Sequence, residues 1–152
     1  MGDDEAVLGI IETQVAWLMR LGEASRRATA APHRALDRAA YVILRQLQQD
    51  GPMNVSALAD ALNLDGSTVT RQLTALQQDG LIERRRDPAD GRGTVISATD
   101  GGLHQVEAVR AARRTLYGSV LRHYRPEEKL ELANALERFT AALAAHMRTT
   151  RD

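Results

Sequence analysis

The fold of this chain is decided by four neighbouring segments: STVTRQ at residues 67–72, GLIERRR at 80–86, DPADGR at 87–92 and SATDGG at 97–102. The first has the polar residues of a helix start, and Gly80 can end that helix in the left-handed conformation. The next two predict a basic β-hairpin, because Gly, Pro and Asp are dense at its tip. Such a helix beside an arginine-bearing flap is suited to contact a nucleic-acid duplex twice, in the major groove and in the minor groove.

Asp65 is expected to cap the helix that follows it. Its carboxylate can accept the unpaired amides of Ser67 or Thr68 and suits the positive helix end. Apolar residues at i, i+4 and i+7 mark the inward face of this helix, and the remaining positions face outward. The inward residues are Val69, Leu73 and Leu76, and the outward ones are Ser67, Thr68, Arg71, Gln72 and Ala75.

Periodic apolar residues predict further helices on both sides of this region. The first expected helix covers about residues 6–28 and the second runs from Leu36 to Leu47. A short third helix is capped by Asn54, and the helix after Asp65 is the fourth. The fifth follows the cap Thr99, and the sixth begins at Pro126. The fifth helix should have about 24 residues and reach about 36 Å. Segments rich in β-formers at 81–86 and 94–98 predict the two strands of the hairpin. The fold class is therefore mainly α with a small β-hairpin.

Composition sets further limits. The chain has 152 residues, which allows a single domain with its own core. The absence of cysteine excludes disulfides, thiolate metal sites and a cysteine nucleophile. No apolar run approaches the roughly 20 residues that would cross a bilayer. The acidic start, Met1 to Glu5, is unlike a secretory leader. We therefore expect a cytoplasmic protein without a membrane partner.

The formal net charge is zero, which counts against an indiscriminate nucleic-acid binder but allows a specific one. Arginines gather in three blocks, at residues 20–45, 84–92 and 110–125. The first and third blocks can equally be solvated helix faces, as charge runs usually are. The middle block, next to the polar helix, carries the functional expectation.

With these elements in place, the chain resembles the multiple-antibiotic-resistance regulator (MarR) family of winged helix-turn-helix repressors. The resemblance covers nearly the whole chain in the order of its elements. Its specific part is a series of motifs that match in order and spacing: Leu58-Ala59, Ser67 to Arg71, Leu76 to Arg84, Asp90-Gly91-Arg92 and Thr99 to Gly102. Each motif alone is weak, and together they are a strong signal. The family often has a second arginine where this chain has Gly91, so the wing tip has one positive charge fewer.

The resemblance implies one domain over residues 1–152. Its DNA-binding winged helix-turn-helix lobe covers about 36–99, and long dimerisation helices cover about 6–28 and 100–148. Helices with more apolar surface than one small lobe can cover favour a two-fold homodimer, although a monomeric bundle is the simpler alternative. The expected DNA is double-stranded and near-palindromic, with half-sites about one turn, roughly 34 Å, apart.

The resemblance and side-chain chemistry together suggest a role for each polar residue of the helix that follows Asp65. Ser67 and Thr68 suit phosphate oxygens or base edges. Thr70 is expected to support the turn or to donate to a phosphate. Arg71 is the candidate for a bidentate guanine contact and Gln72 for adenine, although Arg71 could instead form a surface ion pair with Asp79.

The wing residues receive roles in the same way. Arg92 would enter a narrow, A·T-rich minor groove, unless it is an unstructured loop charge in the protein without DNA. Asp90 is expected to orient Arg92 or to pair with Arg84. Arg85 or Arg86 should contact phosphate, but strand alternation lets only one of these two point that way. Arg84 and Arg86 are counted among the DNA-binding candidates, and which arginine of 84–86 contacts phosphate stays open. The arginine run could also be a solvated strand edge.

Other functions find less support. Trp17, Tyr41, Tyr117 and Tyr124 could line a pocket for a small aromatic or lipophilic effector, but such residues more often pack a core or an interface. His33, His104, His123 and His146 have no metal-ligand spacing. The sequence has no catalytic constellation, so it predicts no enzyme, no cofactor and no metal. The alternative in a different class is a winged-helix module that binds proteins and no longer binds DNA.

Overall fold

The computed structural model describes residues 2–28 and 36–150. It divides into two compact units between residues 35 and 36. The described part of the first unit is one helix, α1 (Gly2–Ala28), with Asp3, Asp4 and Glu5 in its first turn. It begins four residues before the expected start, because these acids suit the positive end of a helix. Its large apolar side chains, including Trp17 and Leu18, are exposed.

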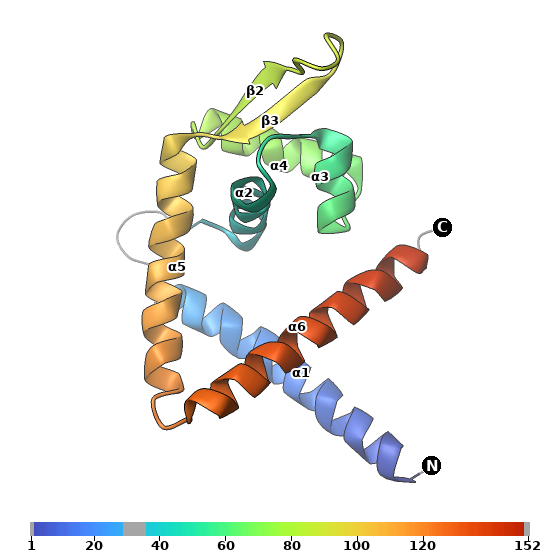
Figure 1. The fold of residues 1–152 in the computed structure, drawn as a ribbon, viewed down its shortest axis with the longest axis vertical. Helices are drawn as coiled ribbons and strands as arrows, with labels where there is room; N and C mark the ends of the chain where they lie inside the picture. Colours follow the sequence, from blue (N-terminus) through green and yellow to red (C-terminus); the bar gives the residue numbers. More distant parts are fainter. Residues whose placement is uncertain (1, 29–35, 151–152) are drawn as a thin grey trace. The chain divides into compact units, whose positions relative to one another are not determined.

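The second unit begins with a lobe of short elements (Figure 1). In chain order they are α2 (Arg38–Asp50), β1 (Met53–Asn54), α3 (Val55–Leu62), α4 (Gly66–Gln78), β2 (Ile82–Arg86) and β3 (Thr94–Ala98). The expected caps are confirmed. The side chains of Asn54 and Asp65 accept backbone amides at the starts of α3 and α4. Gly80 has φ 71°, and the left-handed conformation lets the chain leave α4 without strain.

The sheet has three antiparallel strands in the order β1-β3-β2. The hairpin of β2 and β3 was expected, with Arg86 opposite Thr94 at its far end. The sequence reading missed the third strand, β1, in which Met53 pairs with Ile96. A strand of two residues, of which the second is already the cap of α3, is too short to show a strand period, so only the pairing with β3 reveals it.

A single apolar core holds the lobe together. Its fully or almost fully buried residues come from α2, α3, α4, the sheet, the next helix and the residues just before α2 and β2: Leu36, Ile43, Leu44, Leu47, Leu58, Ala59, Val69, Leu73, Leu76, Leu81, Ile82, Ile96 and Val106. The inward face expected for α4 is thus confirmed at all three positions. Burial of this face determines which side of α4 is left for other contacts.

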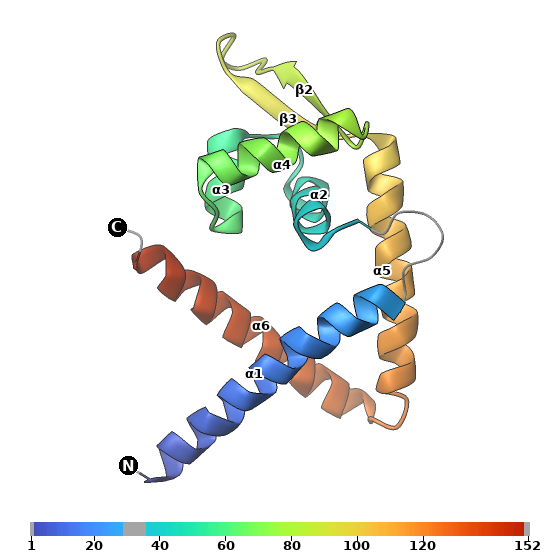
Figure 2. The same cartoon turned by 180° about the vertical axis from the view of Figure 1, so that it is seen from behind.

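Two long helices follow the sheet. α5 (Asp100–Val120) has Thr99 as its N-cap and 21 residues, slightly fewer than expected. α6 (Pro126–Thr149) starts with proline and a capping box in which the Glu128 side chain accepts the Arg125 amide at 2.8 Å. Figures 1 and 2 show α5 beginning beside β3 and α2. None of the residues of α6 is buried, and its apolar residues are exposed: Leu132, Leu136, Phe139, Leu143 and Met147.

Candidate nucleic-acid interface

The first turn of α4 is organised around Asp65. Its Oδ1 accepts the Thr68 amide at 2.8 Å and the Ser67 hydroxyl at 2.5 Å, and its Oδ2 accepts the Thr68 hydroxyl at 2.6 Å. The hydrogen bond from Ser67, followed by those from Thr68, holds the pKa of the Asp65 carboxyl well below its usual range. The sequence predicted the cap but missed that the same carboxylate binds both hydroxyls.

Thr70 and Arg71 occupy the outward side of α4, and both are exposed. The Thr70 hydroxyl donates to the Gly66 carbonyl at 2.7 Å, which matches its expected role in supporting the turn. Arg71 has neither an ion pair nor a hydrogen bond to any residue that the structure describes, so the alternative pair with Asp79 does not form there. The guanidinium of Arg71 is therefore available to an external ligand.

Gln72 departs from the expected outward position. Its side chain is half-buried, and its Oε1 atom is shielded from solvent without a hydrogen-bond partner. Residues advance by about 100° around a helix, so position 72 lies at the border of the stripe formed by Val69 and Leu73. Thr68 is half-buried as well. The fully exposed part of the polar face is thus narrower than the sequence predicted.

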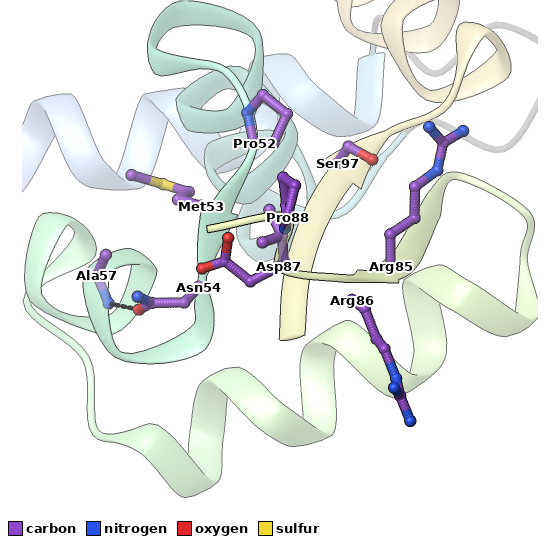
Figure 3. Close-up of a pocket in the computed structure, with 10 residues that line it drawn as sticks. Pro52, Met53, Asn54, Ala57, Arg85, Arg86, Asp87, Pro88 and Ser97 are labelled. Atoms are coloured by element: carbon purple, nitrogen blue, oxygen red, sulfur yellow. Dashed lines mark hydrogen bonds between the residues drawn. The ribbon is translucent and has the colours of Figure 1, made fainter. Parts of the chain in front are cut away.

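The three consecutive arginines of β2 have different surroundings. Arg84 pairs with the buried Ile96 in the hairpin register, so its side chain lies on the core side of the sheet. It is half-buried, and its Nε is covered without a partner. Arg85 forms an ion pair of 2.5 Å with Glu83. Arg86 is exposed and has no partner in the described structure, and Figure 3 shows it pointing away from Arg85.

The tip of the wing is closed by its own hydrogen bonds. The Asp87 amide donates to the Gly93 carbonyl at 2.9 Å, and the Asp90 side chain accepts the Arg92 amide at 3.2 Å. Asp90 thus holds the backbone of Arg92, and whether it also orients the Arg92 side chain for DNA stays a prediction. The other role, a pair with Arg84, does not occur in the described structure. In the hairpin register Arg84 instead lies opposite the buried Ile96, on the core side of the sheet.

Known proteins with similar sequences identify the family of this chain. The pattern of the MarR family matches residues 36–94, the lobe and most of the wing. YxaD, an HTH-type transcriptional regulator of Bacillus subtilis, is 36% identical over 107 residues, which are 70% of this chain and 75% of YxaD.

The chain belongs to the MarR family. It is thus a winged helix-turn-helix transcription regulator, and members of this family bind DNA and are not enzymes. MdtR, a transcriptional repressor of Bacillus subtilis, is 32% identical over 67% of this chain and 63% of its own length.

Solved structures share the fold. A MarR family protein from Bacillus stearothermophilus has a TM-score of 0.78 at 20% identity, over 91% of this chain and 96% of that one. RV1404 from Mycobacterium tuberculosis has a TM-score of 0.73 at 26% identity, over 90% of this chain and 92% of that one. The mainly helical fold with a small antiparallel wing sheet is therefore that of the MarR family.

An open groove of about 640 Å³ lies beside the wing of this MarR protein (Figure 3). Residues from the start of β1 and α3 line one side, and residues from β2 and β3 line the other. They include Pro52, Asn54, Arg86, Pro88 and Val95. Of the four aromatic residues considered for an effector pocket, none lines this groove.

Those aromatic residues have separate surroundings. Trp17, Tyr117 and Tyr124 are exposed, whereas Tyr41 is half-buried beneath Arg113. Among the described residues, no group of three potential metal ligands gathers, and His33 lies outside the described residues. Within the same residues, no helix has both the length and the apolar character needed to cross a membrane.

Proposed function

We propose that this MarR-family regulator is a homodimeric repressor that binds a near-palindromic site in double-stranded DNA. Each subunit lays α4 in a major groove and extends its wing tip into the adjoining minor groove. The main support is that three exposed arginines of this surface have no acidic partner in the described structure: Arg71 on α4, Arg86 on β2 and Arg92 at the tip. An unpaired guanidinium on a protein surface can bind phosphate or guanine without first losing an internal contact.

The arginines of α5 provide a contrast. Arg110 and Arg114 both pair with Glu107, at 3.1 and 2.6 Å, and Arg113 stacks on Tyr41. These cations already have partners inside the protein, as expected of a solvated or structural helix face. The contrast supports DNA contact by the middle arginine block, and a local group of unpaired arginines would let a chain of zero net charge bind DNA.

The homodimer is supported by the exposed apolar side chains of α6. Leu136, Phe139 and Leu143 follow one another at helical spacing, and each is at least 40% exposed in the single chain. Exposed apolar stripes of this kind mark interfaces. A second copy would cover them and hold two α4 helices about 34 Å apart, one turn of DNA.

The repressor assignment is supported by MdtR, which carries that function in its name. Release by a small aromatic or lipophilic molecule completes the proposal. A ligand releases DNA only to the extent that it prefers a different spacing of the two α4 helices. The resemblance to the family is the support for this step, and the effector would bind between the lobe and the dimer helices.

A gel-shift titration against genomic fragments tests the proposal. We expect binding to a minority of fragments, with affinity that falls steeply as salt rises, because phosphate contacts release counterions. A winged-helix module that binds proteins is the alternative favoured by the zero net charge and by Gly91 at the wing tip. Failure to bind any fragment even at low salt would support that module and contradict the regulator.

A further inference from the structure

We propose that Ser67 and Thr68 contact DNA as hydrogen-bond acceptors and select the exocyclic amino groups of adenine or cytosine over phosphate oxygens. Asp65 is the positioning residue that imposes this choice, because it occupies the protons of both hydroxyls. The inference deepens the proposed function and rests on it, since it concerns the same surface of α4.

The geometry directs the proton of each hydroxyl toward the Asp65 carboxylate. Ser67 Oγ lies 2.5 Å from Asp65 Oδ1, and Thr68 Oγ1 lies 2.6 Å from Asp65 Oδ2. An ionised carboxylate has acceptors only, so each hydroxyl must be the donor in its pair. Both bonds have the short length of hydrogen bonds to charged oxygen. Each hydroxyl oxygen then retains lone pairs but no proton for a partner outside the protein.

The carboxylate stays ionised throughout the range in which DNA binding is measured, because the same contacts lower its pKa. Its negative charge next to the two hydroxyls also opposes the approach of a phosphate. A phosphate oxygen needs a donor, and neither Ser67 nor Thr68 can supply one without breaking its bond to Asp65.

Base edges in the major groove offer the complementary chemistry. Adenine N6 and cytosine N4 carry amino groups that donate, whereas guanine N7 and O6 and thymine O4 only accept. A hydroxyl that can only accept therefore favours a strand position with adenine or cytosine. Ser67 is exposed on the first turn of α4, the part of a recognition helix that contacts base edges.

The variant Asp65→Asn separates the two hydroxyls. The amide oxygen must take the place of Oδ1, because that atom accepts the Thr68 backbone amide, which can only donate. The amide nitrogen then takes the place of Oδ2 and donates to Thr68 Oγ1, which frees the Thr68 proton. The Ser67 proton stays occupied. Asparagine caps helices as well as aspartate does, so α4 should remain folded.

The experiment begins with a selection from random duplexes, using the full chain and its Ser67→Ala and Thr68→Val variants. The positions that lose base preference in each variant identify the bases contacted by each hydroxyl. Synthetic sites then lack either the amino group at these positions (purine for adenine, 2-pyrimidinone for cytosine) or the purine N7 acceptor (7-deazapurine). A neutral methylphosphonate at the adjacent phosphates tests the backbone contact.

For the unmodified chain, we expect removal of the amino group to weaken binding about fivefold, the effect of one ordinary hydrogen bond. On the 7-deaza and methylphosphonate sites, any loss of affinity should be the same for the unmodified chain and for the Ser67→Ala and Thr68→Val variants. In Asp65→Asn, the amino-group effect should decrease at the Thr68 position, because the freed Thr68 proton can now also donate to an acceptor on the DNA, and it should persist unchanged at the Ser67 position. Circular dichroism of each variant checks that the fold is retained.

Three outcomes would overturn the inference while leaving the proposed function intact. In the first, the affinity lost on removing a hydroxyl disappears with a methylphosphonate at the adjacent phosphate and not with removal of the base amino group. In the second, removing the hydroxyls does not change the affinity for a selected site. In the third, Asp65→Asn leaves the amino-group effect at the Thr68 position unchanged. Failure of the unmodified chain to select any site would instead contradict the proposed function itself.

Discussion

The Thr99 hydroxyl donates to the Gly80 carbonyl at 2.7 Å and so joins the end of α4 to the start of α5. The Thr99 amide also donates to the Leu81 carbonyl at 3.0 Å. The same threonine caps α5 by accepting the Gly102 amide. One residue thus connects the helix proposed to contact DNA to the long helix that leaves the lobe.

The junction tolerates no side chain at Gly102. A β-carbon there would overlap the Leu81 carbonyl oxygen and press on Leu44. We expect Gly102→Ala to lower the free energy of unfolding by about 1 to 3 kcal/mol, the usual effect of overpacking. Gly101→Ala is a matched control, because its β-carbon would meet only Thr99 Oγ1 at an ordinary 3.7 Å. Urea denaturation that finds the two variants equally stable would contradict the close packing.

Arg71→Ala should weaken binding to the specific site by about 1 to 3 kcal/mol and relax base preference at one position of each half-site. The reason is the loss of an unpaired guanidinium that can form two hydrogen bonds to guanine. Arg114→Ala is the control, because Arg114 is already paired with Glu107. Fluorescence anisotropy with the specific site and single-base variants measures both effects. Equal isotherms for Arg71→Ala and the unmodified chain would refute this role.

Arg92→Ala should reduce affinity about fivefold on sites with A·T-rich flanks, the equivalent of one hydrogen bond. The loss should be smaller on G·C-rich flanks, because narrow A·T-rich minor grooves have a more negative potential. The unmodified chain and the variant are each measured on both kinds of site. The ratio of the A·T-rich to the G·C-rich affinity then removes any general loss of binding. An identical loss on both flanks would indicate a phosphate contact rather than insertion into the minor groove.

The guanidinium carbon of Arg113 on α5 lies 4.2 Å from the centre of the Tyr41 ring on α2. Removal of this cation–π contact by Arg113→Ala should lower the free energy of unfolding by about 0.5 to 1 kcal/mol. A double-mutant cycle with Tyr41→Leu, at one protein concentration, isolates the pair. Additive losses would show that the contact contributes nothing. Tyr41→Phe, which keeps the ring, should preserve the coupling.

The cap of α4 should make stability depend on pH. The pKa of Asp65 is lowered in the folded protein, so its stabilising effect is complete above its unfolded pKa, near 4, and declines as the pH falls toward the lower folded value. The melting temperature of the unmodified chain relative to Asp65→Asn should therefore decrease between about pH 5 and about pH 2. Other carboxylates titrate in both proteins and cancel. A difference that is constant with pH would contradict the lowered pKa.

Much of this protein follows from local sequence. Asn54, Asp65 and Thr99 cap the expected helices because short polar side chains next to apolar periods satisfy unpaired amides. The apolar spacing of Val69, Leu73 and Leu76 correctly predicts the buried face of α4, since helical geometry alone determines which residues share a face. The motif order was sufficient to predict the MarR family, which the comparisons confirm.

Tertiary structure decided what local patterns cannot encode. Strand β1 exists only because Met53 meets Ile96 in β3, a pairing between residues far apart in the chain. The three arginines of β2 are identical in sequence, yet register places Arg84 opposite a buried isoleucine, Glu83 pairs with Arg85, and Arg86 remains exposed. Burial and charge pairing depend on which distant residues a side chain meets, so only the folded chain could distinguish these arginines and reveal that Asp65 holds both hydroxyl protons.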